Sequence, residues 1–161
     1  MAVTTEYATE VANVQASPIV MQEASKYHGK LRIMSVTYTQ SAAAGDIGSI
    51  SYIAKLPAGK VQLLGGLCQI KRDAFGASRT MSWGFDAYTP RAGGTAVSAS
   101  DNALDSALDY SAAGTGGLCS AKSNLTAEFD SRDGVLIRGK VAGGTIPANC
   151  KMQGFIVYSV E

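Results

Sequence analysis

The sequence predicts a mainly β protein: an antiparallel β-sandwich, jelly-roll-like, with one short helix and an N-terminal arm. The main observation is a near-repeat of a β-like run, an aliphatic residue, Pro, Ala, a residue tolerant of positive φ, and a second β-like run. It spans residues 47–72 around Leu56-Pro57-Ala58-Gly59 and residues 135–160 around Ile146-Pro147-Ala148-Asn149. Pro holds φ at about −65°, and Gly or Asn adopts the left-handed conformation, so both segments are expected to form tight corners. We expect the two corners at equivalent positions of the two sheets.

Composition supports one compact domain that associates with neighbours. A chain of 161 residues is the size of a single domain and is long enough to bury a core. Charged residues make up 17% of the chain against a usual value of roughly 25%, and the net charge is +1. Low charge favours association, so we expect a subunit whose flanks are covered. Lys and Arg occur singly, so neither nucleic acid nor an acidic membrane is an expected partner.

The chain divides into an arm, residues 1–28, and a single β-sandwich domain, residues 29–161. Residues 1–6 lack the basic region and apolar run of a secretory signal, and no segment has the roughly twenty apolar residues that span a bilayer. We therefore expect synthesis in the cytoplasm and no membrane partner.

The arm carries the only candidate partner contacts. Val3, Tyr7, Val11 and Val14 recur at spacings of four, four and three, which would line one face of a short helix. Its β-branched residues make that helix weak by itself. Two interpretations stay open: a poorly ordered or loosely docked arm, or an arm that becomes ordered on a neighbouring subunit.

From Gly29 onward the period of the sequence changes to two, which indicates strands. Residues 30–39 have two partly apolar faces, one with Leu31 and Ile33 and the other with Met34 and Val36. Residues 47–55 predict the next strand, after which the Pro57 corner follows.

Residues 60–73 predict one long strand, in which Gly65 and Gly66 mark a bulge or a close approach of another segment. Residues 80–88 place Met81, Trp83 and Phe85 on one side, and we expect Trp83 to anchor the core.

The second half contains the predicted helix. Ser100 stands at an N-cap position, Asp101 follows in the first turn, and Leu104, Ala107 and Leu108 have helical spacing, which predicts a helix over residues 101–110. Two β-like runs, residues 124–130 and 135–141, flank the dipeptide Asp133-Gly134 and predict a β-hairpin. Residues 151–160 predict the closing strand.

The histidine and cysteine residues indicate neither a metal site nor a catalytic site. His28 is the single histidine, next to no nucleophile motif, so a His-based zinc site is excluded and a catalytic triad would have to use it. We expect an ordinary surface or hinge residue. Cys68, Cys119 and Cys150 have no ligand spacing, so we expect buried, reduced thiols.

Asp101, Asp105 and Asp109 would form an acidic stripe on the predicted helix. A straight helix fans such carboxylates apart, whereas calcium sites draw oxygens from a curved loop, so we expect a solvated face. We predict no catalytic residue, no cofactor and no metal.

Residues 47–115 contain a series of turn and strand motifs in a fixed order. They are a strand with Leu56-Pro57-Ala58-Gly59, a long strand, the loop Ala74-Phe75-Gly76, the strand from Thr80 to Gly84, and the Ala- and Asp-rich run Ala99-Ser100-Asp101-Asn102-Ala103-Leu104. In these motifs the chain resembles small virion structural proteins of tailed bacteriophages. The resemblance implies a β-sandwich capsid-associated protein, of the head decoration (cement) or minor capsid type, with no catalytic residues.

On this resemblance, the first functional hypothesis is a decoration protein on the capsid surface of a virion, made in the host cytoplasm. Its expected partners are the major capsid protein and copies of itself, as a homo-oligomer such as a trimer. The alternative is a tail- or fibre-associated adaptor or a host-surface binding module. An enzyme and a non-phage β-sandwich binding module are the remaining, weaker interpretations.

Overall fold

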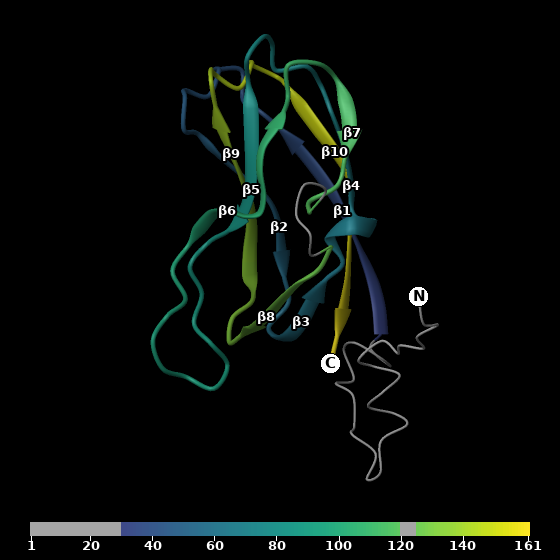
Figure 1. The fold of residues 1–161 in the computed structure, drawn as a ribbon, viewed down its shortest axis with the longest axis vertical. Coiled ribbons are helices and arrows are strands. Elements are labelled where there is room, and N and C mark those ends of the chain that lie inside the picture. Colours follow the sequence, from purple (N-terminus) through teal and green to yellow (C-terminus); the bar gives the residue numbers. More distant parts are fainter. Residues whose placement is uncertain (1–29, 120–124) are drawn as a thin grey trace, which may run out of the picture.

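The computed structural model describes residues 30–119 and 125–161, which form two antiparallel β-sheets (Figure 1). The predicted β-sandwich class is confirmed, whereas the jelly-roll-like detail and the division into arm and domain stay predictions. His28 and the arm residues Val3, Tyr7, Val11 and Val14 lie outside the described residues.

The 6-stranded sheet is built around β10, with the order β7-β4-β10-β3-β8 and β1 on the other side of β10. All ten residues of β1 pair with β10, whose opposite edge pairs first with β4 and then with β3. Its strands are β1 Lys30–Thr39, β3 Gly59–Leu63, β4 Gln69–Arg72, β7 Gly114–Gly116, β8 Ala127–Ser131 and β10 Lys151–Val160.

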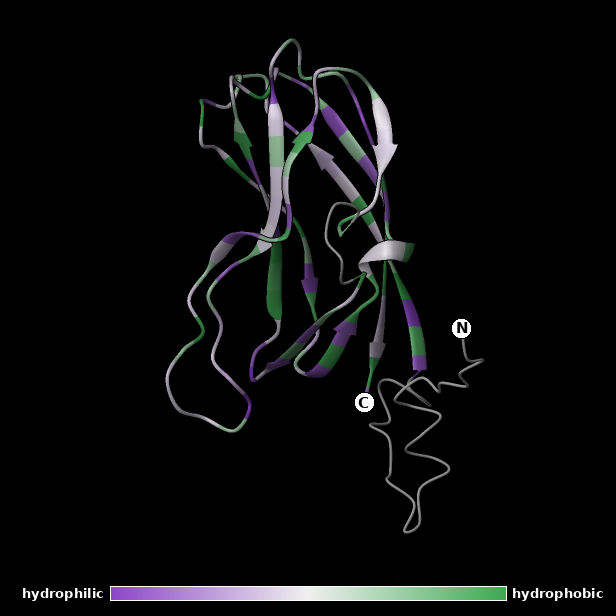
Figure 2. Cartoon of the chain, viewed as in Figure 1, coloured by the Kyte–Doolittle hydropathy of each residue, from purple (hydrophilic) through white to green (hydrophobic). Residues whose placement is uncertain are grey.

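The 4-stranded sheet has the order β2-β9-β5-β6. Hydrophobic and hydrophilic residues alternate along many strands of both sheets, as the colours of Figure 2 show, because one face of each sheet is buried against the other. The strands are β2 Ile50–Leu56, β5 Thr80–Phe85, β6 Ser100–Asp109 and β9 Val135–Ala142.

The two proline corners are equivalent, as the near-repeat predicts. The Pro57 corner leads from β2 to β3 and the Pro147 corner from β9 to β10, so each crosses from the 4-stranded to the 6-stranded sheet. Gly59 has a φ of 104° and Asn149 a φ of 58°, the left-handed backbone expected at these positions. Because β2 and β9 run antiparallel, the two corners lie at opposite ends of the molecule (Figure 1).

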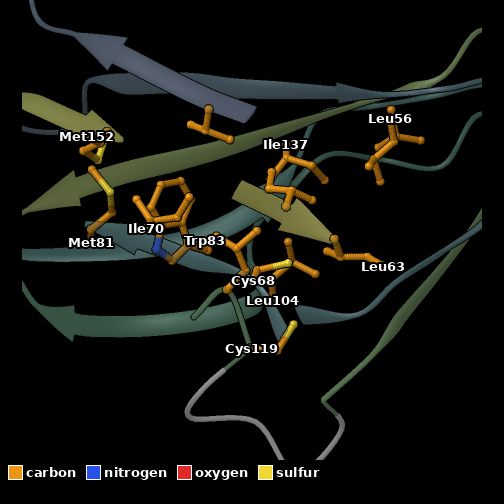
Figure 3. Close-up of a cluster of buried hydrophobic side chains, with 14 of the residues drawn as sticks. Leu56, Leu63, Cys68, Ile70, Met81, Trp83, Leu104, Cys119, Ile137 and Met152 are labelled. Atoms are coloured by element: carbon orange, nitrogen blue, oxygen red, sulfur yellow. The ribbon is translucent and has the colours of Figure 1, made fainter. Parts of the chain in front are cut away.

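Trp83 lies fully buried in the core between the sheets (Figure 3), which confirms its predicted role as an anchor. Its indole Nε1 donates a hydrogen bond to the hydroxyl of Tyr110 at 3.1 Å. The Phe75 ring meets Tyr110 edge-on, with ring centroids 5.1 Å apart. A Cβ on Gly139 would lie 2.8 Å from the indole, so the strand beside Trp83 needs glycine there.

The helix predicted over residues 101–110 is wrong: Ser100–Asp109 is strand β6. It pairs with β5 in an irregular register, with Trp83 opposite Asp105 and shifts on both sides of that pair. This irregularity buries the adjacent residues Leu104 and Asp105 and gives Ala107 a φ of 52°. Apolar and polar residues therefore do not alternate along β6 as they do in a regular strand. Pairing with β5 overrides the preference for a helix that the local spacing of apolar residues indicates.

Two other expectations need correction. The hairpin predicted around Asp133-Gly134 does not form, because β8 and β9 belong to different sheets and the turn is a crossing between them. The strand predicted over residues 60–73 is split by a 3-10 turn, η1 Gly65–Leu67. The predicted close approach exists at Gly65, where a Cβ would lie 2.2 Å from Sγ of Cys119.

Tyr110→Phe is expected to destabilise the protein by about 1–3 kcal/mol, because the buried indole N–H of Trp83 loses its acceptor. Urea unfolding followed by tryptophan fluorescence measures the change. Tyr52→Phe is the matched control, since the Tyr52 hydroxyl donates at an exposed position and its loss should cost less. Equal stability of the two variants would contradict the proposed importance of the buried bond.

Candidate interaction surfaces

The described residues contain no cluster of candidate metal ligands. Within residues 30–119 and 125–161 no group of three or more His, Cys, Asp or Glu side chains could hold a metal ion. In the same part of the chain, no helix is both long and apolar enough to cross a membrane.

The three cysteines are buried thiols that form no disulfide, as predicted. Burial raises the pKa of the Cys68 thiol, and it raises the pKa of Cys150 to about 11. Both thiols are therefore protonated at neutral pH, and a protonated thiol is neither a nucleophile nor a metal ligand.

The predicted solvated acidic stripe does not exist, because the three aspartates lie on a strand and have different surroundings. Asp105 is fully buried opposite Trp83. Asp109 accepts a hydrogen bond from the backbone N–H of Ser111 at 2.8 Å, and hydrogen bonds from Ser111 lower its pKa. Asp101, in contrast, is part of a larger network of hydrogen bonds and ion pairs.

Asp101 belongs to a polar network on the outer face of the 4-stranded sheet, which we call the Arg138 network. The Arg138 guanidinium donates to Asp101 at 2.5 Å and to Asp86 at 3.3 Å. Lys140 donates to the second oxygen of Asp101 at 2.7 Å, and the Tyr52 hydroxyl donates to Asp86 at 3.0 Å. Two cations and two anions are thus held in one geometry by groups from β2, β9, β6 and the end of β5.

The electrostatics of the network favour the ionised form of Asp101. The hydrogen bond from Lys140 is the main cause that lowers the pKa of Asp101, and the nearby Arg138 charge adds to it. The Arg138 side chain is only 11% exposed and makes two charge-assisted hydrogen bonds. The network therefore pairs two basic with two acidic side chains and has no net excess of charge.

Apolar residues border this network. Tyr52 is 47% exposed, and Ile50 and Leu136 lie on the same outer face with 38% and 36% exposure. Tyr and Arg are enriched at protein interfaces, and the buried centre of an interface is more apolar than its rim. The outer face of the 4-stranded sheet is the first candidate interaction surface.

Gly84 makes the network possible. An added Cβ would lie 1.9 Å from the carbonyl oxygen of Ser100, because the start of β6 crosses directly over this glycine. That crossing brings Asp101 to the two basic residues of β9, Arg138 and Lys140.

The second candidate surface is the β1 patch, defined as Leu31, Ile33 and Phe155 on the outer face of the 6-stranded sheet. Leu31 is 61% exposed, Ile33 70% and Phe155 38%. Phe155 lies opposite Ser35 in the β1–β10 ladder, so the three side chains share one face. The prediction that this strand is partly apolar on both faces is confirmed, since Val36 on the opposite face is buried.

A shallow pocket lies elsewhere on the 6-stranded sheet, beside η1. Its volume is about 210 Å³, and Leu125 on its rim is 56% exposed. It has no charged lining residue, so nothing in it favours a particular ligand. Its lining residues are Gly66, Cys68, Gln69, Thr115, Gly116, Gly117 and Leu125.

The similarity of this chain to known proteins is weak. Scans against protein-family models and against curated proteins each found no match. A chain of the cyanophage Pam1 capsid asymmetric unit is similar at 13% identity and a TM-score of 0.48, covering 100% of both chains. A chain of the infectious bursal disease virus Gx strain structure is similar at 10% identity and a TM-score of 0.48, covering 81% of this chain and 32% of that chain. At these values the likeness carries no conclusion about this chain.

Sequence reasoning missed the Arg138 network. Its charged members come from positions 86, 101, 138 and 140, and only the last two are close in the sequence. The one local signal is Arg138 and Lys140 at alternate positions of a strand, which places both on one face. The β1 patch had a clear signal, because Leu31 and Ile33 alternate in the sequence.

Asp101→Asn is expected to lower the urea midpoint at pH 7, because Arg138 and Lys140 lose their shared anion. The pKa of Asp101 is lower in the folded than in the unfolded protein, so its stabilisation is present above the unfolded value of about 4 and is lost as pH falls through the folded value. The difference between wild type and variant should therefore shrink as the pH is lowered below about 4. Asp133→Asn, at an exposed aspartate without an ion pair among the described residues, is the control.

Gly84→Ala is expected to destabilise the protein by about 2 kcal/mol or more, because the new methyl group must displace the backbone at Ser100. Thermal unfolding measures the loss. Gly116→Ala is the matched control, since a Cβ there meets nothing nearer than 3.4 Å. A wild-type melting temperature for Gly84→Ala would show that β6 does not cross β5 in this way.

Proposed function

We propose that this chain is a non-enzymatic structural protein of a phage virion, which decorates and stabilises the capsid surface. The observation that carries the proposal is a two-sheet body with exposed apolar residues on both outer faces: Tyr52, Ile50 and Leu136 on one, Leu31 and Ile33 on the other. A protein that serves as a connector needs contact surfaces on more than one side.

The physical chemistry of the chain supports an assembled state. Charged residues make up only 17% of the chain, so little charge repulsion opposes packing against neighbours. Fixed charge patterns such as the Arg138 network select the register of an interface more than they add affinity. The resemblance of residues 47–115 to phage virion proteins gives the assembly its proposed identity.

The proposed partners are the major capsid protein and copies of this chain, in a homo-oligomer such as a trimer. Neither nucleic acid nor a membrane is a proposed partner, since Lys and Arg are scattered along the chain. The proposed tether is the arm, with Val3, Tyr7, Val11 and Val14 as its contact residues. The proposed location is the outer surface of the virion, and the chain needs no cofactor or metal for this role.

Deletion of residues 1–20 is expected to leave a cooperative melting transition and to reduce capsid occupancy sharply, because the arm supplies much of the contact area. Stable interfaces bury on the order of 1,200–2,000 Å², which an arm of this length can contribute to substantially. Co-sedimentation with capsids that lack this protein, followed by cryo-electron microscopy, measures occupancy.

The same micrographs test the location. Density for the full-length chain on the capsid face supports the decoration role, whereas density only on the tail or a fibre would favour the adaptor or host-binding alternative. Full occupancy by the deleted chain would place the tether in the sheets instead of the arm.

A further inference from the structure

Strand β1 has an open edge. Among the described strands it pairs only with β10, through ten consecutive residue pairs without a register shift. The backbone N–H of Gln40 donates to the carbonyl of Cys150 at 2.8 Å, in continuation of this ladder. Because hydrogen-bonded pairs alternate in an antiparallel ladder, Leu31, Ile33, Ser35 and Thr37 direct their backbone groups away from β10, toward the open edge.

From Ile33 onward the edge lacks the usual protection against further pairing. Proteins protect edge strands with proline, bulges, short length or charged side chains. β1 is ten residues long and contains neither proline nor a bulge, and its two charged residues, Lys30 and Arg32, lie at its first end. Its open edge also borders the apolar side chains of Leu31 and Ile33, which are 61% and 70% exposed. Such an edge accepts an added strand, which gains main-chain hydrogen bonds and apolar contact together.

The two faces of β1 differ in a way that specifies the incoming segment. Leu31 and Ile33, at odd positions, lie on the outer face, and Lys30 and Arg32, at even positions, are exposed on the other face. Neither basic residue has an ion-pair partner among the described residues. A matching strand therefore carries apolar residues at alternate positions and carboxylates at the positions between them.

The arm of the chain has this pattern. Its odd positions from 3 to 11 are Val, Thr, Tyr, Thr and Val, which are all strand-favouring residues, and its even positions include Glu6 and Glu10. The four-residue spacing of Val3, Tyr7 and Val11 fits a strand face as well as a helix face, because four is a multiple of two. Residues 1–28 contain three acidic residues and one lysine, so the arm has a charge of −2 and the rest of the chain +3.

We propose that residues 3–11 of one copy bind along the open edge of β1 of a neighbouring copy as an added strand, with Val3, Tyr7 and Val11 beside the β1 patch and Glu6 and Glu10 beside Lys30 and Arg32. The choice of a neighbouring copy rests on the proposed function, in which copies associate. The connecting residues 12–29 can span up to about 60 Å, since an extended chain spans about 3.3 Å per residue.

Cysteine cross-linking in the full-length protein tests this. Thr9→Cys and Ser35→Cys are made as separate variants, since positions 9 and 35 fall on the same face in the proposed arrangement and the native thiols are buried. When the two variants are mixed and treated with a short bis-maleimide, a covalent dimer with one arm linked to one β1 is expected. Peptide mapping identifies the linked pair.

Ile33→Glu is expected to reduce the yield of this dimer on the order of tenfold, because it removes an apolar contact and places a charge on the edge. Ile47→Glu is the matched control: Ile47 is 69% exposed, Ile33 is 70% exposed, and Ile47 lies outside β1. An equal loss for both variants, or no loss for Ile33→Glu, would overturn the assignment of the edge.

Two results overturn the proposal itself. A double variant, Thr9→Cys with Ser35→Cys, that cross-links only within one chain shows that the arm covers its own edge. Absence of any arm-to-β1 product shows that the arm does not bind this edge. Capsid occupancy distinguishes the failure of this proposal from the failure of the proposed function. If the protein binds capsids but no cross-link forms, only the strand addition is refuted. If the cross-link forms but the protein does not bind capsids, only the decoration role is refuted.

Discussion

The fit of Trp83 between the sheets is the constraint on which the structure depends. The indole fits because Gly139 on the neighbouring strand has no side chain, and its N–H is satisfied by Tyr110. Buried polar atoms without partners are costly, so this bond fixes where the segment after β6 lies against the core. Tyr110 in turn has the Arg72 guanidinium 4.2 Å from its ring centroid, which connects the Trp83 site to β4 of the other sheet. The two sheets are thus joined through one aromatic group.

The corners could be predicted because each depends on a local rule. Pro57 with Gly59, and Pro147 with Asn149, meet a backbone requirement within three residues, and Trp83 was recognisable from its alternating neighbours. Strand β6 could not be predicted in the same way. Its conformation is set by β5 through an irregular register, so Leu104 and Asp105 are buried side by side and the period of two disappears. Local spacing then favoured a helix that pairing with β5 prevents.

The two candidate surfaces differ in the same way: one could be inferred from the sequence, and the other could not. The β1 patch could be inferred from alternation within ten residues, although only the sheet order shows that its edge is open. The Arg138 network could not be inferred from the sequence, because Asp86, Asp101 and Arg138 come together only where β6 crosses Gly84. Charged groups that are far apart in the sequence attract each other through space, so their pairing gives no regular spacing in the sequence. A surface formed by such groups can be recognised only from the arrangement of the strands.

The pairing of Lys30 with Val160 has a mechanical consequence. The first residue of β1 and the last residue of β10 are opposite each other. A force that separates these two ends therefore breaks the hydrogen bonds of the ladder one pair after another. A pull on Lys30 against the far end of β10, at Lys151, would instead load all ten pairs in shear. A subunit held by its arm therefore resists tension well only if its other attachment lies away from the C-terminus.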